Sequence, residues 1–217
     1  MTVASRENVR RFAVCYSGGS GIAYGIRLVE VLLDAGHEVH LCATGAGLRV
    51  LLHEAGMSVD PDRPDLASLF EPRLRSRLRV HALAAVEATP ASGSAGIEAV
   101  VVVPCSMGTL ARIAHGFSSN LVERAADVAL KEGRTLVVVP RETPLSALHL
   151  KNMLVLARLG AVVLPAMPGF YHRPATVEDL VDFVVGKILD RLRVEHAIVR
   201  RWGASSPPAS PWTEDEE

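Results

Sequence analysis

Short apolar runs alternate with segments of helical periodicity along most of this chain. The apolar runs are nearly continuous in Val, Leu, Ile and Ala, which is typical of strands buried on both faces. They predict strands at residues 11–16, 38–43, 99–103, 134–139 and 161–164. The segments between them predict helices at residues 22–35, 44–56, 106–115, 121–132, 145–159 and 176–194. Alternation at this spacing predicts an α/β fold with a parallel sheet covered by helices on both faces.

The stretch from residue 58 to residue 94 is less regular. Prolines interrupt it, and its end at residues 89–94 predicts a loop. From Arg200 onward Pro and Ser accumulate, which is typical of an extended tail. We therefore expect a flexible N-terminus at residues 1–10, a single domain at residues 11–200 and a C-terminal extension at residues 201–217.

Composition narrows the function classes. The 217 residues carry a formal net charge of −1 and are 49% hydrophobic, with 5% aromatic residues. This charge leaves no basic footprint for nucleic acid, and no apolar run is long enough to span a membrane. The three cysteines, Cys15, Cys42 and Cys105, form no CxxC pair, which favours a reducing compartment. We expect a cytoplasmic protein that binds neither nucleic acid nor membrane.

Ligands of a parallel α/β sheet bind outside the carboxyl ends of its strands. Three predicted loops lie there, at residues 17–21, 104–109 and 140–143. The first is glycine-rich and opens a helix, so its amides could face a phosphate. It departs from the dinucleotide fingerprint, because Tyr24 replaces the third glycine and Thr44 stands where an NAD site has an acid. These features favour a mononucleotide; the alternative is a tight turn that binds nothing.

The candidates for nucleophilic catalysis and for metal binding are weak. Ser20 lacks the last glycine of the GxSxG nucleophile elbow, and Cys105 is interpreted as a small buried apolar side chain. The eight histidines show neither an HxxxH pair nor a cysteine at ligand spacing. We therefore expect no metal.

The third loop places an arginine and an acid, Arg141 and Glu142, directly after a predicted strand. They could be an ion pair that holds the loop. Arg124 and Lys131 lie on the preceding predicted helix, and a later loop adds Tyr171. Several cations with one acid and one phenol suit an organic phosphate better than a neutral metabolite.

The sequence resembles the UbiX-like flavin prenyltransferases from about Phe12 to Trp202, most strongly after Ala99. The motifs that carry the resemblance are PCSMGTLA at 104–111, NLVERAADVALKE at 120–132, PRETPL at 140–145, HLKNM at 149–153 and PGFYHRP at 168–174. The resemblance implies a flavodoxin-like (Rossmann-type) three-layer sandwich. It further implies transfer of a dimethylallyl group from dimethylallyl phosphate to reduced FMN, without a metal. The prenylated FMN would serve a UbiD-like decarboxylase, and the enzyme would be a homo-oligomer, a dodecamer.

The resemblance also implies roles for individual residues. The expected FMN contacts are Gly18, Gly19, Ser20, Thr44, Ser106, Met107, Gly108, Thr109 and Arg141. The prenyl phosphate would be held by Tyr171 and Lys187, with Ser92, Arg124 and Lys131 nearby. Glu142 and Ser20 would assist proton movement, Glu54 would be a supporting acid, and Trp202 would form part of the pocket wall.

The sequence departs from the family pattern at two positions that concern the prenyl donor. Lys187 replaces the usual arginine, which keeps a positive charge but loses the bidentate fork. Val86 stands where the family often has a tryptophan. The alternatives are an FMN-dependent cysteine decarboxylase and a non-catalytic flavin carrier. The decarboxylase would typically need a histidine in the first helix, and residues 22–35 contain none.

Overall fold

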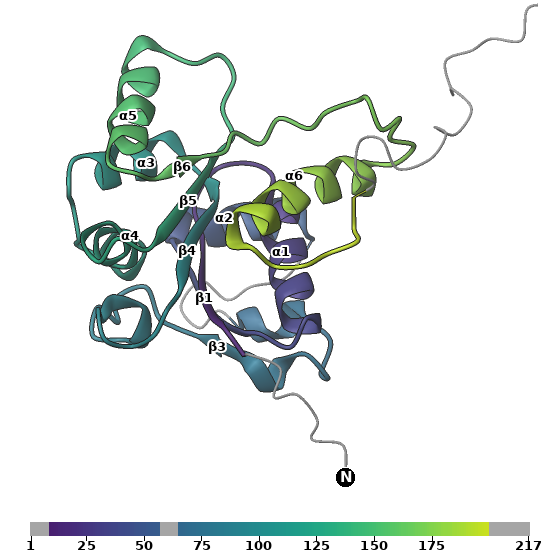
Figure 1. Ribbon diagram of the computed structural model, residues 1–217, viewed down its shortest axis with the longest axis horizontal. Coiled ribbons are helices and arrows are strands. Elements are labelled where there is room, and N and C mark those ends of the chain that lie inside the picture. The colour runs from purple at the N-terminus through teal and green to yellow at the C-terminus, as the bar shows by residue number, and fades with distance from the viewer. Residues whose placement is uncertain (1–8, 57–64, 200–217) are drawn as a thin grey trace, which may run out of the picture.

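A computed structural model of the chain describes residues 9–56 and 65–199. Its centre is a sheet of six parallel strands in the order β3-β2-β1-β4-β5-β6 (Figure 1). The strands are β1 (Arg11–Tyr16), β2 (Glu38–Ala43), β3 (Leu78–Val80), β4 (Ala99–Cys105), β5 (Thr135–Pro140) and β6 (Val162–Val163). This is the Rossmann-type order, and the direction of winding reverses between β1 and β4. A crevice is therefore expected at the carboxyl ends of these two strands.

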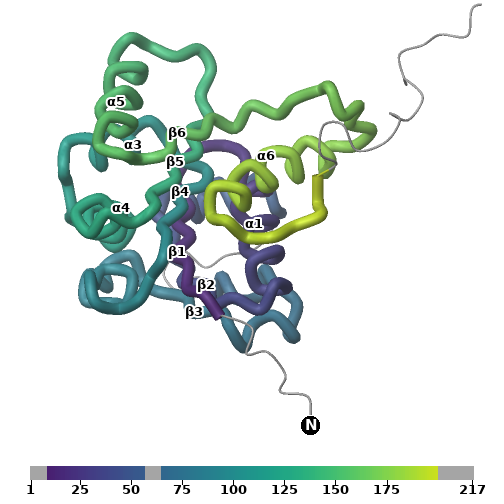
Figure 2. The backbone as a smooth tube through the Cα atoms, viewed as in Figure 1, coloured from purple at the N-terminus to yellow at the C-terminus, as the bar shows by residue number. Residues whose placement is uncertain are grey.

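Helices cover both faces of the sheet, so the predicted three-layer α/β sandwich is confirmed. One face carries α1 (Ile22–Asp34), α2 (Gly45–Glu54) and α6 (Val177–Leu192), and the other carries α3 (Met107–Ala114), α4 (Leu121–Lys131) and α5 (Ala147–Arg158). The path of the chain between the two layers can be followed in Figure 2. Short 3₁₀ turns lie at η1 (Leu66–Leu69), η2 (Arg75–Arg77) and η3 (Thr89–Ala91).

The sheet separates two apolar cores because side chains alternate between its faces. On β1, Phe12 and Tyr16 point into the core under α1 and α6, while Ala13 and Cys15 point toward α4. The small side chains on the second face allow the alanine-rich side of α4 to pack closely against the strand. Both faces are fully covered, which explains why the strands read as continuous apolar runs.

Close packing of α1 against the sheet depends on a glycine. A Cβ atom on Gly25 would lie 2.6 Å from Cε1 of Tyr16 and 2.7 Å from the carbonyl oxygen of Val103. The helix is also tied to α6, because Arg27 Nε donates to Oδ1 of Asp182 at 2.7 Å. These contacts hold α1 and α6 together on one face of the sheet (Figure 1).

The structure adds elements that the sequence pattern did not predict. Strand β3 is a three-residue edge strand in which only Leu78 is buried, so it carries no apolar run.

Arg10, assigned from sequence to the flexible N-terminus, is held by Glu98 and donates to the carbonyl oxygens of Leu192 and Arg193 at 2.6 and 3.0 Å. Trp202 and the expected C-terminal extension lie outside the described residues. No helix in residues 9–56 and 65–199 is long and apolar enough to cross a membrane.

Candidate functional site

The loop after β1 is fastened to the loop after β4 at the point where the winding of the sheet reverses. The hydroxyl of Ser17 donates to the carbonyl oxygen of Pro104 at 2.9 Å and accepts the N–H of Ser106 at 2.8 Å. Ser17 is fully buried, so these bonds are shielded from water. Two of the three loops predicted from sequence therefore form one rigid unit.

Glycines allow this loop to pass between its neighbours. A Cβ atom on Gly18 would lie 2.6 Å from Cβ of Ala46 at the start of α2. A Cβ atom on Gly19 would lie 3.3 Å from Cβ of Pro104. A larger residue at Gly18 would push the loop away from α2, so close approach is the physical reason for the Ser-Gly-Gly-Ser sequence.

A carboxylate from α2 occupies the N-terminus of α1. Oε2 of Glu54 accepts the N–H of Gly21 at 2.8 Å and the N–H of Ile22 at 3.0 Å. These two amides are therefore engaged by Glu54, and within the loop at residues 17–21 the N–H of Gly21 is not available to a phosphate. The reason is that an anion supplied by the chain itself already binds at this helix end.

Glu54 also links the first loop to the third. Burial acts to raise its pKa, but hydrogen bonds from Ser20, Ile22 and Gly21 and the charge of Arg141 outweigh burial and lower it. Arg141 approaches from the end of β5, where its Nε donates to the carbonyl oxygen of Ser20 at 3.2 Å. The structure thus brings Ser20, Glu54 and Arg141 together, three residues to which the family resemblance assigns roles at one site.

Glu142 points elsewhere. Its Oε1 accepts the N–H of Thr143 at 3.1 Å, and the side chain is exposed. Within the described part of the chain Arg141 and Glu142 form no ion pair, so the alternative that they simply hold the loop is not supported. The acid is accessible to a ligand at the same edge.

Helices α2 and α3 begin at this edge with hydroxyl caps. The hydroxyl of Thr44 accepts the N–H of Gly47 at 3.0 Å, and that of Ser106 accepts the N–H of Thr109 at 3.3 Å. A helix N-terminus attracts anions because its first amides are unpaired and its dipole is positive there. Gly108 has open space on its Cβ side, whereas Met107 is buried. Met107 could therefore contact a flavin through its backbone but not through its buried side chain.

Tyr171 and Lys187 both contact the ring of Phe183. The rings of Tyr171 and Phe183 meet edge to face with centroids 5.6 Å apart, and Nζ of Lys187 lies 5.6 Å from the Phe183 centroid. Lys187 also lines a cavity of about 310 Å³ between β6 and α6. The structure brings these two expected phosphate ligands together.

The remaining expected phosphate ligands lie apart from the loops that follow β1, β4 and β5. Lys131 ends α4 shortly before β5 begins, which places it near the amino edge of the sheet, and its Nζ pairs with Glu132 at 2.6 Å. Ser92 lies near the same edge, because the carbonyl oxygen of its neighbour Gly93 accepts a hydrogen bond from Arg134. Within one chain, Ser92 and Lys131 therefore lie near the edge of the sheet opposite the loops that follow β1, β4 and β5. Trp202 lies outside the described residues.

Arg124 is engaged within its own helix. Its Nη1 donates to Oδ2 of Asp127 at 2.8 Å, and its side chain is only partly exposed. The structure does not join it to Arg141 or Lys187. Like Lys131, it is held on α4 rather than on a loop at the carboxyl edge.

Other sequence hypotheses can be compared with the structure directly. Burial raises the pKa of the Cys105 thiol to about 12, which agrees with its interpretation as an unreactive apolar side chain. No cluster of metal-ligating side chains lies within residues 9–56 and 65–199.

The sequence analysis missed Glu123, a buried acid that fixes the loop before α4. A signal was present, because Asn120 followed three residues later by Glu123 is typical of a helix N-cap.

The comparisons with known proteins agree with this geometry. The family model described as Flavoprotein matches residues 2–189. Flavin prenyltransferase UbiX of Halalkalibacterium halodurans is 48% identical over 88% of this chain and 93% of the relative. This chain belongs to the UbiX flavin prenyltransferase family. The Pseudomonas aeruginosa member is 46% identical over 89% of this chain and 94% of its own length.

Solved structures of UbiX proteins share the fold. The structure of AnUbiX in complex with FMN and dimethylallyl pyrophosphate has a TM-score of 0.80 and 37% identity, covering 92% of this chain and 100% of that one. The structure of a dodecameric FMN-dependent UbiX-like decarboxylase from Escherichia coli has a TM-score of 0.78 and 39% identity, covering 89% and 100%. The expected family and fold are confirmed.

Proposed function

We propose that this chain is a flavin prenyltransferase that transfers a dimethylallyl group from dimethylallyl phosphate to N5 and C6 of reduced FMN. The observation that carries the proposal is the convergence of Ser20, Glu54 and Arg141 where the winding of the sheet reverses. Family membership and the AnUbiX structure with FMN and dimethylallyl pyrophosphate support it.

FMN fits the anion-binding features of this edge. The N-termini of α2 and α3 and the guanidinium of Arg141 provide positive potential for the FMN phosphate and the reduced ring. Gly18 and Gly19 let the backbone lie close to the flavin, with Thr44 and residues 106–109 completing the contacts. Bound FMN supplies the nucleophilic ring atoms of the reaction.

The chain's own side chains hold the prenyl phosphate and move protons. Tyr171 and Lys187 hold the phosphate, so that charge developing on it is stabilised as the allylic C–O bond breaks. Closing the new ring at C6 releases a proton, for which Glu142 and the departing phosphate are the acceptors. Ser20 is held beside Glu54 by a hydrogen bond, in position to pass a proton near N5.

Ser92 and Lys131 reach the prenyl phosphate only from another copy of the chain. Ser92 and Lys131 lie near the opposite edge of the sheet within one chain, as described above. A homo-oligomer places such residues of one subunit beside the flavin loops of the next, and the related Escherichia coli protein is a dodecamer. We propose that this chain assembles in the same way.

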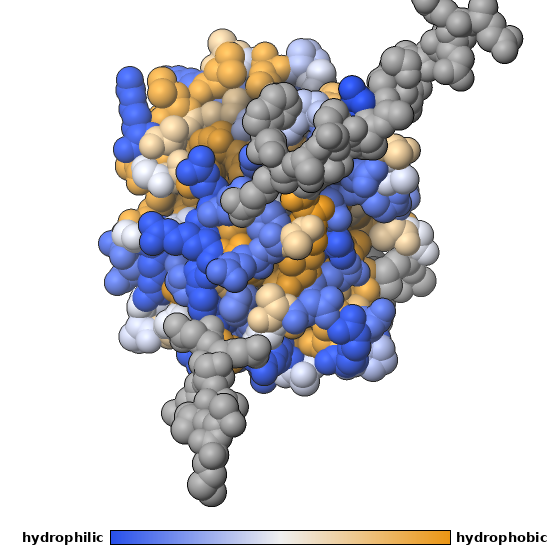
Figure 3. Space-filling view, turned by 45° about the vertical axis from the view of Figure 1, so that its right-hand side comes forward, coloured by the Kyte–Doolittle hydropathy of each residue, from blue (hydrophilic) through white to orange (hydrophobic). Residues whose placement is uncertain are grey.

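The surface of α5 supports assembly. Apolar side chains reach the surface in the upper part of the molecule, where Figure 1 places α5 (Figure 3). On α5 and its C-cap, four large apolar side chains, those of Leu148, Leu150, Leu154 and Leu159, are 50–62% exposed. Four large leucines in one segment exceed the scattered apolar exposure of a monomer, and a subunit interface would cover them.

The product would serve a UbiD-like decarboxylase, which we propose as the downstream partner. We place the reaction in the cytoplasm, because Cys15, Cys42 and Cys105 are all free thiols, as expected in a reducing compartment.

The direct test is to mix the full chain with reduced FMN and either dimethylallyl phosphate or the pyrophosphate, and to weigh the flavin by mass spectrometry. A mass gain of one dimethylallyl unit supports the proposal, and the two donors separate monophosphate from pyrophosphate use. Unchanged flavin with decarboxylation of a cysteine substrate would favour the cysteine decarboxylase alternative. Unchanged flavin that stays bound without turnover would favour the carrier.

Complementation tests the shared site. Lys131→Ala and Arg141→Ala should each be inactive as homo-oligomers. Co-expression should restore part of the activity, because some interfaces then join an intact Lys131 from one subunit to an intact Arg141 from the next. No recovery in mixed oligomers of the correct mass would overturn the assignment of Lys131 to a neighbouring subunit.

A further inference from the structure

Three aromatic rings form a cluster where the chain enters α6. The imidazole of His172 stacks on the ring of Phe183, with centroids 5.2 Å apart and an interplanar angle of 9°. The ring of Tyr171 meets the imidazole edge to face at 5.8 Å. Nζ of Lys187 lies over the same Phe183 ring. His172 thus belongs to the group of side chains that includes both expected phosphate ligands.

The two ring nitrogens of His172 are buried and have no hydrogen-bond partner among the described residues. A neutral imidazole carries one N–H donor and one acceptor, and burying either without a partner is costly. A phenylalanine would stack equally well without that cost. A histidine at this position therefore indicates that a polar group from outside the described residues meets a ring nitrogen.

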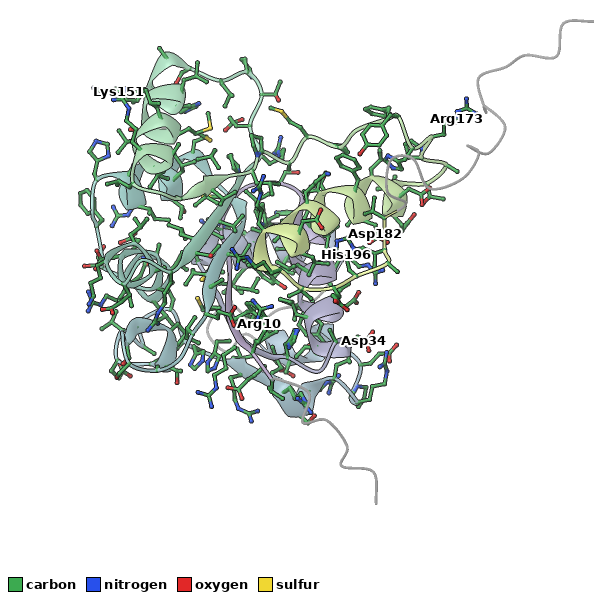
Figure 4. The ribbon with its side chains drawn as sticks, in the orientation of Figure 1. Arg10, Asp34, Lys151, Arg173, Asp182 and His196 are labelled. Atoms are coloured by element: carbon green, nitrogen blue, oxygen red, sulfur yellow. The ribbon has the colours of Figure 1, made fainter. Side chains whose placement is uncertain are left out.

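The charges around the imidazole favour an anion as that group. Lys187 shares the Phe183 ring, and Arg173 follows His172 at the tip of the same loop, as Figure 4 shows. The acid near the imidazole is Asp179, in the first turn of α6. Its Oδ2 accepts the N–H groups of Ala175 and Thr176 at 2.8 and 3.0 Å, and these bonds, with a smaller contribution from the charge of His172, lower its pKa. Asp179 is already paired with those amides, whereas Lys187 places a positive charge at the ring on which His172 stacks, which favours an anionic ligand.

We propose that His172 is a phosphate-binding residue, in which an imidazole N–H donates to the phosphate of the prenyl donor beside Tyr171 and Lys187. This inference rests on the proposed function and adds one ligand to it. The ring is held flat against Phe183, so the N–H has a fixed direction. It supplies a directional donor next to Lys187, whose ammonium is a point charge without the planar fork of an arginine.

The test compares His172→Phe, which keeps the stacked ring and loses both nitrogens, with His172→Asn, which keeps a side-chain N–H donor. The measured quantities are KM for dimethylallyl phosphate, kcat, and the dissociation constants of FMN and of inorganic phosphate. We expect His172→Phe to raise KM and the phosphate dissociation constant about tenfold, with FMN affinity unchanged. His172→Asn should stay within about threefold of the parent. His115→Phe, at the exposed C-cap of α3, is the matched control and should leave KM unchanged.

Three results would overturn the proposal. One is an unchanged KM and phosphate affinity in His172→Phe. A second is an equal loss of FMN affinity, which would indicate a general distortion of the site. The third is a smaller particle mass of His172→Phe than of the parent protein, measured by light scattering. That result would mean that the ring nitrogens of His172 contact another subunit rather than a phosphate. If the parent protein made no prenylated flavin, the proposed function would fail, while phosphate binding by the parent and by His172→Phe would still decide the role of His172.

Discussion

Glu123 is a buried carboxylate that fixes the loop before α4. It is 2% exposed and accepts hydrogen bonds from the guanidinium of Arg112 and from the N–H and hydroxyl of Ser119, the latter two at 2.9 and 2.8 Å. Burial acts to raise its pKa, but the hydrogen bonds from Arg112, Ser119 and Asn120 prevail and lower it from 4.5 to about 2. The charge of Glu123 is therefore more favourable in the folded chain than in the unfolded one.

The shift in the pKa of Glu123 sets how much its charge contributes to the free energy of unfolding. A fall in pKa from 4.5 to about 2 on folding stabilises the folded chain by about 3 kcal/mol at neutral pH, at ~1.4 kcal/mol per pKa unit. Because the folded-state pKa is the lower one, this stabilisation is fully present above the unfolded-state pKa and is lost as the pH falls toward the folded-state value. At pH 3 less than half of it remains.

The variant Glu123→Gln keeps the size of the side chain and removes its charge. We expect its free energy of unfolding, measured by urea titration at one protomer concentration, to be lower by about 3 kcal/mol at pH 7 and by less than half of that at pH 3. Glu87→Gln, at an exposed loop position, is the matched control and should change stability by less than about 0.5 kcal/mol. An equal loss at both pH values would refute the reasoning, because the loop would then depend on shape rather than on charge.

Three further substitutions test packing and chemistry. Gly25→Ala should lower the free energy of unfolding by about 1–3 kcal/mol, because the new Cβ would lie 2.6 Å from Tyr16 and 2.7 Å from Val103. Calorimetry measures this change. The control is Gly108→Ala, whose new Cβ would meet nothing within 4 Å. Glu142→Gln should retain FMN but slow ring closure by about a hundredfold in single-turnover mass measurements; formation of prenylated flavin at full rate would remove Glu142 from the mechanism. Tyr171→Phe should weaken binding of dimethylallyl phosphate about tenfold by calorimetry, because a phenol donor is lost; an unchanged dissociation constant would contradict that role.

The layers of the fold could be predicted because both faces of the sheet are covered. A strand such as β4, in which all seven residues are buried, reads as a continuous apolar run. The edge strand β3 could not be found in this way, since two of its three residues are exposed. Its pairing with β2 comes from tertiary position rather than from its own sequence.

The position of the loops at residues 17–21, 104–109 and 140–143 could also be predicted, because the carboxyl ends of parallel strands lie at one edge of the sheet. This places Ser20 and Arg141 together although they are far apart in sequence. The position of Glu54 at the N-terminus of α1 could not be derived from its own surroundings, because the helix that carries it is exposed near its end and its partners precede it by 32 and 33 residues. Only the resemblance to the family assigned it to the site.

The length of β5 explains why Lys131 could not be placed from sequence. Six residues of parallel strand span about 20 Å, and Lys131 precedes β5 while Arg141 follows it. Exposed charges are screened over about 8 Å at physiological ionic strength, so in one chain Lys131 has little influence on an anion beside Arg141. Two residues that are both close to β5 in sequence, Lys131 and Arg141, therefore lie at opposite edges of the sheet. In the assembly proposed above, a second copy of the chain would resolve the conflict, because a symmetric interface repeats in every subunit and would bring a neighbour's α4 to each site.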